Sequence, residues 1–292
     1  MALRIDHLSK RYPNGVQALD DVSLTIGPGM FGLLGPNGAG KSTLMRTLAT
    51  LQDADAGTAR LGDVDVLRDK DATRRLLGYL PQEFGVYPKV AADEMLDHLA
   101  ALKGITNAKE RREIVDALLQ QTNLFDVRKR PLGSFSGGMK QRFGIAQALL
   151  GKPGLVIVDE PTAGLDPEER VRFHNLLGEI GENVIVILST QIVGDVIDLC
   201  RDMAILHQGR VLMTGDPTGA VTALEGRIWQ KTIDRPELAD HQAKHRVVST
   251  RLFAGRTRLH VFADERPDAS FAPIAPDLED VYFAAIKGFG RA

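Results

Sequence analysis

Residues 35–43 read GPNGAGKST and fit the pattern G-x-x-x-x-G-K-[ST]. A short apolar run, residues 30–34, precedes the loop, and a segment with helical periodicity, residues 42–51, follows it. Glycines permit a tight loop whose backbone N–H groups point inward, and the helix that begins there adds unpaired N–H groups and the positive end of its dipole. The stretch therefore predicts a strand–loop–helix unit that binds a nucleoside triphosphate, rather than a glycine-rich turn with a chance lysine.

Each residue type in this loop has a specific task in such a site. Lys41 is expected to reach the β- and γ-phosphates of ATP, and the Ser42 hydroxyl is expected to ligate Mg²⁺. The predicted ATP-binding residues of the loop are Gly35, Pro36, Asn37, Gly38, Ala39, Gly40, Lys41, Ser42 and Thr43.

Two adjacent carboxylates follow a second apolar run, LVIVDEP at residues 155–161. Asp159 ends that run, so we expect it at the edge of the sheet beside the phosphate loop, where it can hold Mg²⁺. Glu160 would face the other way in a strand and could orient or deprotonate an attacking water. The alternative is a solvated acidic pair at a strand end, which the phosphate loop in the same chain makes the weaker interpretation.

The order of apolar patterns predicts an α/β core with a helical insert. Residues 155–158 and 184–188 are continuous apolar runs typical of buried strands, and residues 167–180 between them have the pattern of a helix that Asp166 would cap. Residues 90–151 have helical periodicity. After about residue 226 the pattern changes to a hairpin that turns at Gly255 and an amphipathic helix.

Composition excludes some classes of function. The 292 residues are 43% hydrophobic and 25% charged, with a formal net charge of −2, as in an ordinary globular protein. This balance gives no electrostatic reason to bind nucleic acid or an anionic membrane. No apolar run approaches the roughly 20 residues that cross a bilayer. The single cysteine, Cys200, cannot form an internal disulfide, which fits a reducing compartment and the role of a small apolar filler.

Three further stretches distinguish between kinds of phosphate-loop ATPase. They are YLPQEFGVYP around Gln82, GSFSGGMKQR from residue 133 and TAGLD from residue 162. With the phosphate loop and DEP, in this order, they make residues 1–222 resemble the ATP-binding-cassette (ABC) ATPases. SFSGGMKQR resembles the LSGGQ signature of that family, with Phe135 for the leucine and Met139 for the glutamine.

The resemblance implies roles for individual residues. In this family two cassettes pack head to tail, so a homodimer is expected, in which the signature of one chain closes over the ATP of the other. Asp166 would contact the other subunit, which is compatible with its role as a helix cap. Tyr12 would stack on adenine, although a half-buried strand residue is the alternative. The resemblance assigns catalytic roles to Glu160, Gln191 and Gln82, Mg²⁺ contacts to Ser42, Gln82 and Asp159, and ATP contacts in trans to Ser136, Gly137, Gly138 and Met139.

Gln191, in the stretch LSTQIV, departs from the family pattern. A histidine that hydrogen-bonds the γ-phosphate usually occupies this position. A glutamine amide still offers two N–H donors, but it cannot become cationic or pass on a proton. We therefore expect retained ATP binding and dimerisation with slower hydrolysis; the alternative is that glutamine is fully competent.

The resemblance implies a fold class and a domain organisation. We expect an α/β phosphate-loop NTPase with an ABC-type core sheet, an N-terminal antiparallel β subdomain and a helical signature subdomain at about residues 84–150. Residues 1–222 would form this ATPase domain, and residues 223–292 a small α+β C-terminal domain.

The function that follows is that of an ATP-hydrolysing subunit of an ABC membrane transporter. It would be cytoplasmic and peripheral on the inner face of the cell membrane, where it drives a permease on a separate chain. PQEFGVYPKV and LEDVYFAAIKG resemble export-type, drug- or sodium-efflux-like cassettes. Two alternatives remain, a slow or non-hydrolysing ATP-gated clamp and a soluble ABC ATPase that works on ribosomes or DNA; no nucleic-acid partner is expected.

Overall fold

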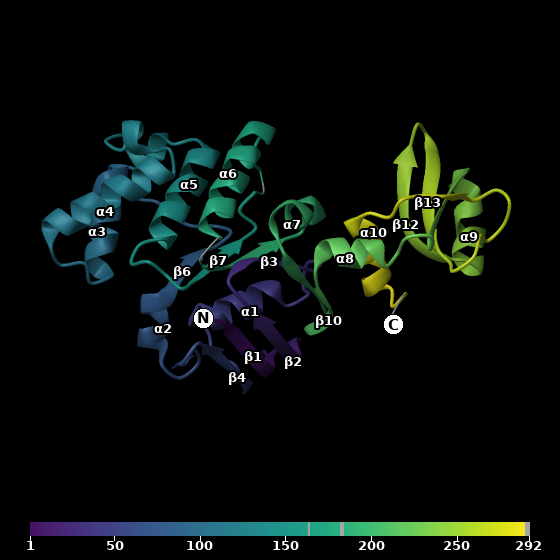
Figure 1. Cartoon of the computed structure of the whole chain (residues 1–292), viewed down its shortest axis with the longest axis horizontal. Helices are drawn as coiled ribbons and strands as arrows, with labels where there is room; N and C mark the ends of the chain where they lie inside the picture. The colour runs from purple at the N-terminus through teal and green to yellow at the C-terminus, as the bar shows by residue number, and fades with distance from the viewer. Residues whose placement is uncertain (163, 182–183, 290–292) are drawn as a thin grey trace.

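A six-stranded sheet forms the centre of the computed structural model, which describes residues 1–162, 164–181 and 184–289 (Figure 1). Its strand order is β10-β9-β3-β8-β7-β6, with five parallel strands and β10 antiparallel at one edge. The strands are β3 (Gly29–Leu34), β6 (Leu77–Leu80), β7 (Leu155–Asp159), β8 (Ile185–Thr190), β9 (Asp202–His207) and β10 (Arg210–Gly215).

The predicted apolar runs form the middle of this sheet. Every residue of β7 and β8 is buried, as expected for parallel strands that are covered on both faces. In the register, Leu34 lies opposite Thr190, and Asp159 lies opposite Ser189. The carboxyl ends of β3, β8 and β7 therefore meet at one edge, the edge at which open α/β sheets bind ligands.

An antiparallel sheet covers one face of the central sheet, with α1 (Lys41–Leu48) packed between them. Its strand order is β2-β1-β4-β5. Leu44, Met45 and Leu48 of α1 share a core with the odd-numbered residues of β7 and with the inward residues of this sheet. The strands are β1 (Leu3–Arg11), β2 (Gln17–Ile26), β4 (Ala56–Leu61) and β5 (Val64–Asp65).

Helix α1 ends earlier than the prediction of residues 42–51. The chain leaves the helix through Thr50, which has a left-handed φ of 61°. The Thr50 N–H donates to the Thr47 carbonyl, and the Leu51 N–H donates to the Arg46 carbonyl, which is a Schellman ending. A threonine at the position that glycine usually occupies concealed this end in the sequence.

Helices cover the other face of the central sheet. The helical segment contains α3 (Ala92–Leu102), α4 (Ala108–Gln121) and α5 (Gly137–Ala148), and α2 (Lys70–Leu76) precedes it. Helix α5 contacts β6 and α6 (Pro167–Ile180), and its Ile145 shares a core with the even-numbered residues Val156 and Val158 of β7. Helices α1 and α5 therefore lie on opposite faces of the sheet.

A third sheet, with strand order β12-β13-β11-β14, lies at the far end of the molecule (Figure 1). Its hairpin turns at Ala254 and Gly255, which both have positive φ, as a two-residue type I′ turn requires. Besides β9 and β10, the helices and strands after β8 are α7 (Val193–Leu199), α8 (Pro217–Thr222), β11 (Ile228–Ile233), α9 (Leu238–Lys244), β12 (Arg246–Phe253), β13 (Arg256–Phe262), β14 (Ala272–Pro273) and α10 (Leu278–Ile286).

Helix α10 joins this third sheet to the central core. Its Leu278, Val281 and Ala284 pack in the core that α6 and α7 share with the central sheet. His260 of β13 and Asp280 of α10, both buried, are joined by a 2.7 Å contact between Nδ1 and Oδ1. The predicted amphipathic helix is thus present, and its apolar face packs against both the central core and the third sheet.

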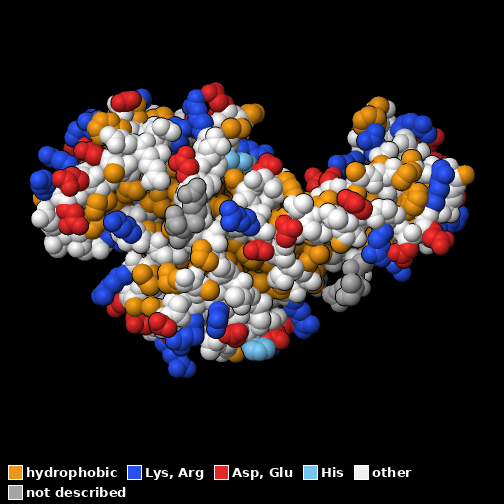
Figure 2. Space-filling view, viewed as in Figure 1, with side chains coloured by type: hydrophobic (Ala, Val, Ile, Leu, Met, Phe, Trp, Pro, Cys, Tyr) orange, Lys and Arg blue, Asp and Glu red, His pale blue; other side chains and the backbone are white. Residues whose placement is uncertain are grey.

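Charged side chains of both signs are interspersed over the face in Figure 2. None of the helices in the described part of the chain combines the length and apolar character that a bilayer crossing requires. Cys200 is buried in the core beneath α7, and burial raises the pKa of its thiol to about 12. This agrees with its predicted role as an apolar filler.

Replacing Gly78 with alanine should destabilise the protein. A Cβ at this position in β6 would lie 2.1 Å from the Ala148 carbonyl oxygen of α5, so the strand and the helix must separate. Overpacking of this kind costs about 1–3 kcal/mol, and we expect a lower urea midpoint for Gly78→Ala. Gly27→Ala is the control, because a Cβ there meets nothing within 4 Å. Equal midpoints for the two variants would contradict this packing.

Candidate functional site

The phosphate loop joins β3 to α1 and depends on glycine at specific positions. Gly38 and Gly40 have φ values of 78° and 107°, in the region that L side chains rarely adopt. A Cβ on Gly35 would lie 2.4 Å from the Leu206 carbonyl oxygen, and one on Gly40 would lie 2.3 Å from the Ala18 carbonyl oxygen. Two glycines of the sequence pattern, Gly35 and Gly40, thus stand where the neighbouring backbone leaves no room for a side chain.

Lys41 lies across its own loop. Its side chain is buried, and its Nζ donates to the Gly35 carbonyl at 2.5 Å and to the Pro36 carbonyl at 3.3 Å. Burial lowers the pKa of Lys41, and the nearby carboxylates of Glu160 and Asp159 partly offset that effect. The ammonium group is therefore held where anionic oxygens would be its strongest partners.

Three segments that are distant in the sequence meet at Glu160. The Gln82 Nε2 donates to Glu160 Oε2 at 3.0 Å, and the Gln191 Nε2 donates to Glu160 Oε1 at 2.5 Å. The same Gln191 nitrogen donates to Asn37 Oδ1 of the phosphate loop at 2.9 Å. The structure thus brings together the residues predicted for catalysis and connects them to the predicted phosphate site.

Glu160 does not continue the strand, contrary to the expectation from alternation. Strand β7 ends at Asp159, and Glu160 has a left-handed φ of 47°. Its N–H donates to the Ser189 carbonyl at 2.8 Å, which holds the residue in this conformation. A non-glycine residue in this region costs about 1–3 kcal/mol, so the surrounding contacts must hold Glu160 in place.

Asp159 is buried beneath this group. Its Oδ1 has no hydrogen-bond partner among the described residues. Burial raises the pKa of Asp159; the nearby Glu160 carboxylate acts in the same direction, and the Ser189 and Ser42 hydroxyls and Lys41 partly offset the shift. A buried carboxylate oxygen without a partner is costly unless a cation or a hydrogen-bond donor meets it.

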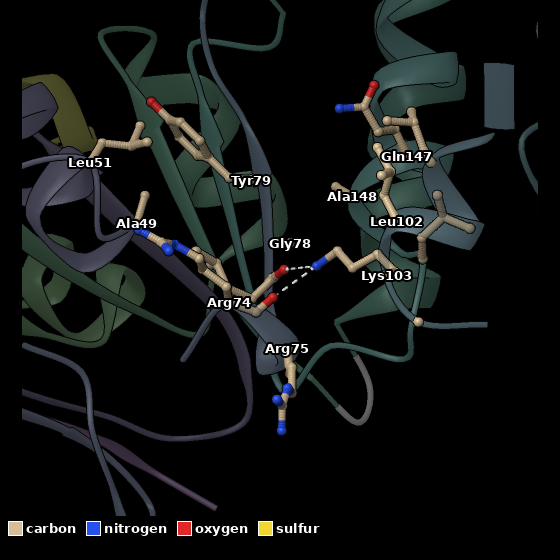
Figure 3. Close-up of a pocket in the computed structure, with 14 residues that line it drawn as sticks. Ala49, Leu51, Arg74, Arg75, Gly78, Tyr79, Leu102, Lys103, Gln147 and Ala148 are labelled. Carbon is tan, nitrogen blue, oxygen red and sulfur yellow. Dashed lines mark hydrogen bonds between the residues drawn. The ribbon is translucent and has the colours of Figure 1, made fainter. Parts of the chain in front are cut away.

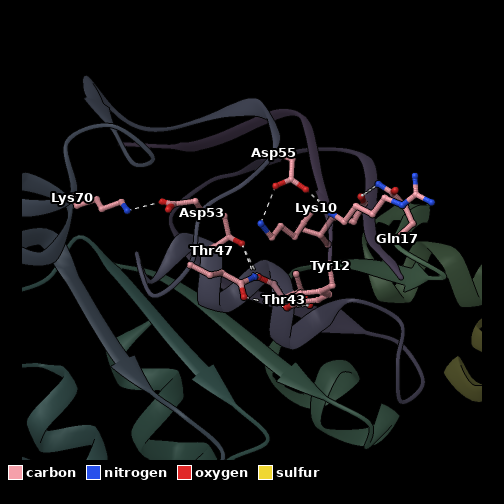
Figure 4. A network of polar contacts seen from close by, with 11 residues as sticks. Lys10, Tyr12, Gln17, Thr43, Thr47, Asp53, Asp55 and Lys70 are labelled. Carbon is pink, nitrogen blue, oxygen red and sulfur yellow. Dashed lines mark hydrogen bonds and ion pairs between the residues drawn. The ribbon is translucent and has the colours of Figure 1, made fainter. Parts of the chain in front are cut away.

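Tyr12 is fixed to the first turn of α1, as Figure 4 shows. Its hydroxyl lies 3.2 Å from Thr43 Oγ1 and donates to Gln52 Oε1 at 3.1 Å. Nearby, Lys10 forms an ion pair with Asp55 at 2.8 Å. These contacts place Tyr12 beside the phosphate loop, and its stacking on adenine stays a prediction.

The signature residues are placed at the N-terminus of α5. Ser136 caps that helix, and its hydroxyl accepts from the Met139 N–H at 3.2 Å. A Cβ on Gly138 would lie 2.4 Å from the Glu169 carboxylate, whereas one on Gly137 would meet nothing. The contact with Glu169 therefore explains why a glycine stands at position 138. At Gly137 no neighbouring atom of the described residues covers the N-terminus of α5.

The structure does not bring the signature to the phosphate loop of the same chain. The helices that carry the two motifs lie on opposite faces of the central sheet. Among the described residues, no hydrogen bond or ion pair links residues 35–43 to residues 135–139. Met139 packs against the core of the helical segment.

Asp166 caps α6, as the sequence predicted. Its Oδ1 accepts from the Glu169 N–H at 2.9 Å, and the residue is otherwise exposed. The cap leaves Oδ2 available, so the predicted contact with another subunit is compatible with this geometry.

One group near the site has no counterpart in the sequence prediction. The carboxylate of Asp195, in α7, is fully buried among Thr162, Thr190, Arg170 and His174. The available signal was an acidic residue in an apolar segment one turn after Gln191. Its partners come from three separate segments, so no local pattern could identify them.

Comparisons with known proteins are consistent with this geometry. Residues 19–163 match the sequence family described as ABC transporter. The chain is 31% identical to the probable multidrug ABC transporter ATP-binding protein YbhF of Escherichia coli, over 99% of this chain and 53% of that protein. It thus spans about half the length of YbhF.

Two further comparisons cover more of the related protein. The daunorubicin/doxorubicin resistance ATP-binding protein DrrA of Streptomyces peucetius is 32% identical over 94% of this chain and 81% of that protein. A solved dimeric structure of the ATP-binding cassette MJ0796, in a post-hydrolysis state with ADP and Pi, matches with a TM-score of 0.66 and 25% identity, over 73% of this chain and 98% of that one. The fold, the site geometry and these matches together show that the chain belongs to the family of ABC transporter ATP-binding proteins.

Proposed function

We propose that this chain is the ATP-binding and ATP-hydrolysing subunit of an ABC transporter, and that it drives a permease on a separate chain. The observation that carries the proposal is the hydrogen-bonded group of Gln82, Glu160 and Gln191 beside the phosphate loop. A carboxylate held between two amides beside the phosphate loop is placed to orient an attacking water, and a clamp that only binds ATP does not require this. This group therefore favours hydrolysis over the clamp alternative.

Residues of this chain would both bind ATP and act in its hydrolysis. The loop N–H groups and Lys41 bind the phosphates of ATP, and Glu160 orients a water molecule in line with the γ-phosphorus. The water oxygen bonds to phosphorus, its proton passes to Glu160, and the bond to the β-phosphate oxygen breaks so that ADP leaves with the electron pair. Gln82 and Gln191 hold the carboxylate in place during these events.

The residues present fit a Mg²⁺ ion. The described residues contain no cluster of three or more His, Cys, Asp or Glu that could hold a metal, so one carboxylate would be joined by hydroxyl, amide and phosphate oxygens. Asp159 offers its unpartnered buried oxygen, Ser42 its hydroxyl and Gln82 the amide oxygen that its bond to Glu160 leaves free. When bound, Mg²⁺ would supply positive charge to the phosphate oxygens.

A head-to-tail homodimer would complete the site. Because the signature and the phosphate loop of one chain lie on helices on opposite faces of the sheet, a second copy must supply Ser136, Gly137 and Gly138 to each bound ATP. The open position at Gly137 leaves room for a close approach of phosphate to the N-terminus of α5. The dimeric MJ0796 structure with ADP and Pi supports this arrangement.

The permease would dock in a groove of about 650 Å³ between the core and the helical segment. Figure 3 shows Leu51 and Tyr79 on one side and Leu102 and Gln147 on the other; Leu51 is 58% exposed and Leu102 is 71% exposed. The Lys103 Nζ connects the two sides through bonds to the Arg74 and Leu77 carbonyls at 2.9 and 2.8 Å. Exposed apolar groups in such a groove suit an amphipathic helix of a partner.

The apolar residues that follow Gln82 are divided between internal packing and the surface. Phe84 and Val86 are partly buried against the helical core, whereas Tyr87 is 65% exposed. Internal packing is therefore the role of the first two, and Tyr87 is the one of these three with an exposed ring that a partner could contact.

Export is the direction that the relatives support. The names of YbhF and DrrA refer to multidrug transport and to drug resistance. We propose that this chain serves an export-type permease and lies on the inner face of the cell membrane through that partner.

Glu160→Gln should abolish ATP hydrolysis and preserve ATP binding, since it removes the proton acceptor and little volume. For the native chain, phosphate release per molecule should rise with protein concentration, because only the dimer has complete sites. Phosphate release and nucleotide binding measured over a concentration series test both statements. A rate per molecule that does not change with concentration would exclude the shared site.

Gln191→Ala should lower turnover by about 10²–10³, as for the loss of a preorganised donor. Gln191→His should raise turnover, if glutamine slows hydrolysis because it cannot pass on a proton. Phosphate release at saturating Mg-ATP measures both. Equal rates for the native chain and Gln191→His would mean that the position requires only a donor.

Leu102→Glu should release the chain from the membrane fraction of the cells that produce it, because a charge in the groove opposes docking of an apolar helix. ATP binding should not change, since Leu102 lies outside the nucleotide site. Leu252→Glu is the control, because Leu252 is 80% exposed at the tip of the β12–β13 hairpin. Retention of both variants in the membrane fraction would exclude this groove as the docking surface.

A further inference from the structure

The carboxylate of Asp195 is the most heavily bonded buried group near the site. The residue has no exposed surface and lies in the first turn of α7. Its Oδ1 accepts from Arg170 Nε at 2.9 Å and contacts His174 Nε2 at 2.9 Å, and its Oδ2 accepts from Thr162 Oγ1 at 2.6 Å and Thr190 Oγ1 at 3.3 Å. A buried charge requires such partners, and each partner is thereby fixed in place.

The two threonines connect this carboxylate to the catalytic group. Thr162 follows Glu160 by two residues, and Thr190 immediately precedes Gln191. The Thr190 hydroxyl also accepts from the Ile192 N–H at 2.9 Å, so it closes a turn with Gln191 at its centre. One carboxylate oxygen thus supports both segments whose side chains meet at Glu160.

The other carboxylate oxygen connects α7 to the helix that Asp166 caps. Arg170 and His174 lie one turn apart on α6 and both contact Oδ1. The residue before Arg170, Glu169, accepts from Arg142 of α5 at 2.8 Å, and Arg142 is buried. Charged contacts therefore link the signature helix α5, α6 and α7 in series.

We propose that Asp195 is a positioning residue for ATP hydrolysis: through Thr190 and Thr162 it fixes Gln191 and Glu160, and through Arg170 it couples them to α6 and the signature helix. The proposal rests on the hydrolytic function proposed above. It goes further, because it assigns the placement of the catalytic group to a residue that touches neither nucleotide nor water.

Single-turnover hydrolysis tests the kinetic side of this inference. Asp195→Asn and Thr190→Val should each lower the rate of phosphate release by about 10- to 100-fold, the range expected for misplaced catalytic groups, with ATP affinity changed less than about twofold. Asp198→Asn is the matched control, because it is the same substitution at an exposed position of the same helix. It should hydrolyse ATP as the native chain does.

A double-variant comparison separates positioning from general stability. In a Gln191→Ala background, Thr190→Val should have little further effect on the rate, because the residue that Thr190 positions is already absent. If Thr190→Val lowers the rate equally in both backgrounds, Thr190 does not act through Gln191 and the inference is overturned.

Hydrogen exchange provides a measurement that does not depend on hydrolysis. In the nucleotide-free protein, Asp195→Asn and Thr190→Val should speed exchange of the Ile192 amide, whereas Asp198→Asn should not. Unchanged exchange in both variants would overturn the inference. If the native chain fails to hydrolyse ATP, the proposed function is wrong, and the exchange result still decides whether Asp195 supports this turn.

Discussion

The register of three parallel strands is the constraint on which the site depends. Because Leu34 lies opposite Thr190 and Asp159 lies opposite Ser189, the strands β3, β8 and β7 end together. That alignment brings the phosphate loop, the buried carboxylate and the turn at Gln191 to one edge. A shift of one residue would move every side chain of a strand to the opposite face of the sheet, where a different helix packs, so close packing on both faces fixes the alignment.

Because elements pack on both faces of the central sheet, the functional motifs lie on different faces. Odd-numbered residues of β7 face α1 and the antiparallel sheet, and even-numbered residues face α5 and α6. Each face is filled by a different helix, and each helix carries a different motif at its N-terminus. One chain therefore brings the catalytic group to the phosphate loop and leaves the signature motif on the other face, which the proposed dimer would use.

Much of this organisation could be predicted from the sequence, and most of the exceptions depend on contacts between distant segments. The phosphate loop and the Asp166 cap depend on local rules for glycine, capping and helix starts, so a short stretch specifies them. The conformation of Glu160 and the surroundings of Asp195 depend on contacts between distant segments. The end of α1 was missed because Thr50 adopts a conformation that usually marks glycine. The periodicity of α10 predicts a helix with one apolar face, but it does not show that this face packs against both the central sheet and the third sheet.

The pairing of β3 with β8 has a consequence for how the chain folds. Met30 pairs with Val186, so joining β3 to β8 requires a very long intervening segment to be ordered, whereas β7 with β8 and β9 with β10 are near in sequence and can pair earlier. In the antiparallel sheet, β1 and β2 are likewise near in sequence and can pair early, before α1 covers their apolar face. Until the long-range pairing forms, such uncovered apolar faces favour association of partly folded chains, and molecular chaperones act on chains of this kind.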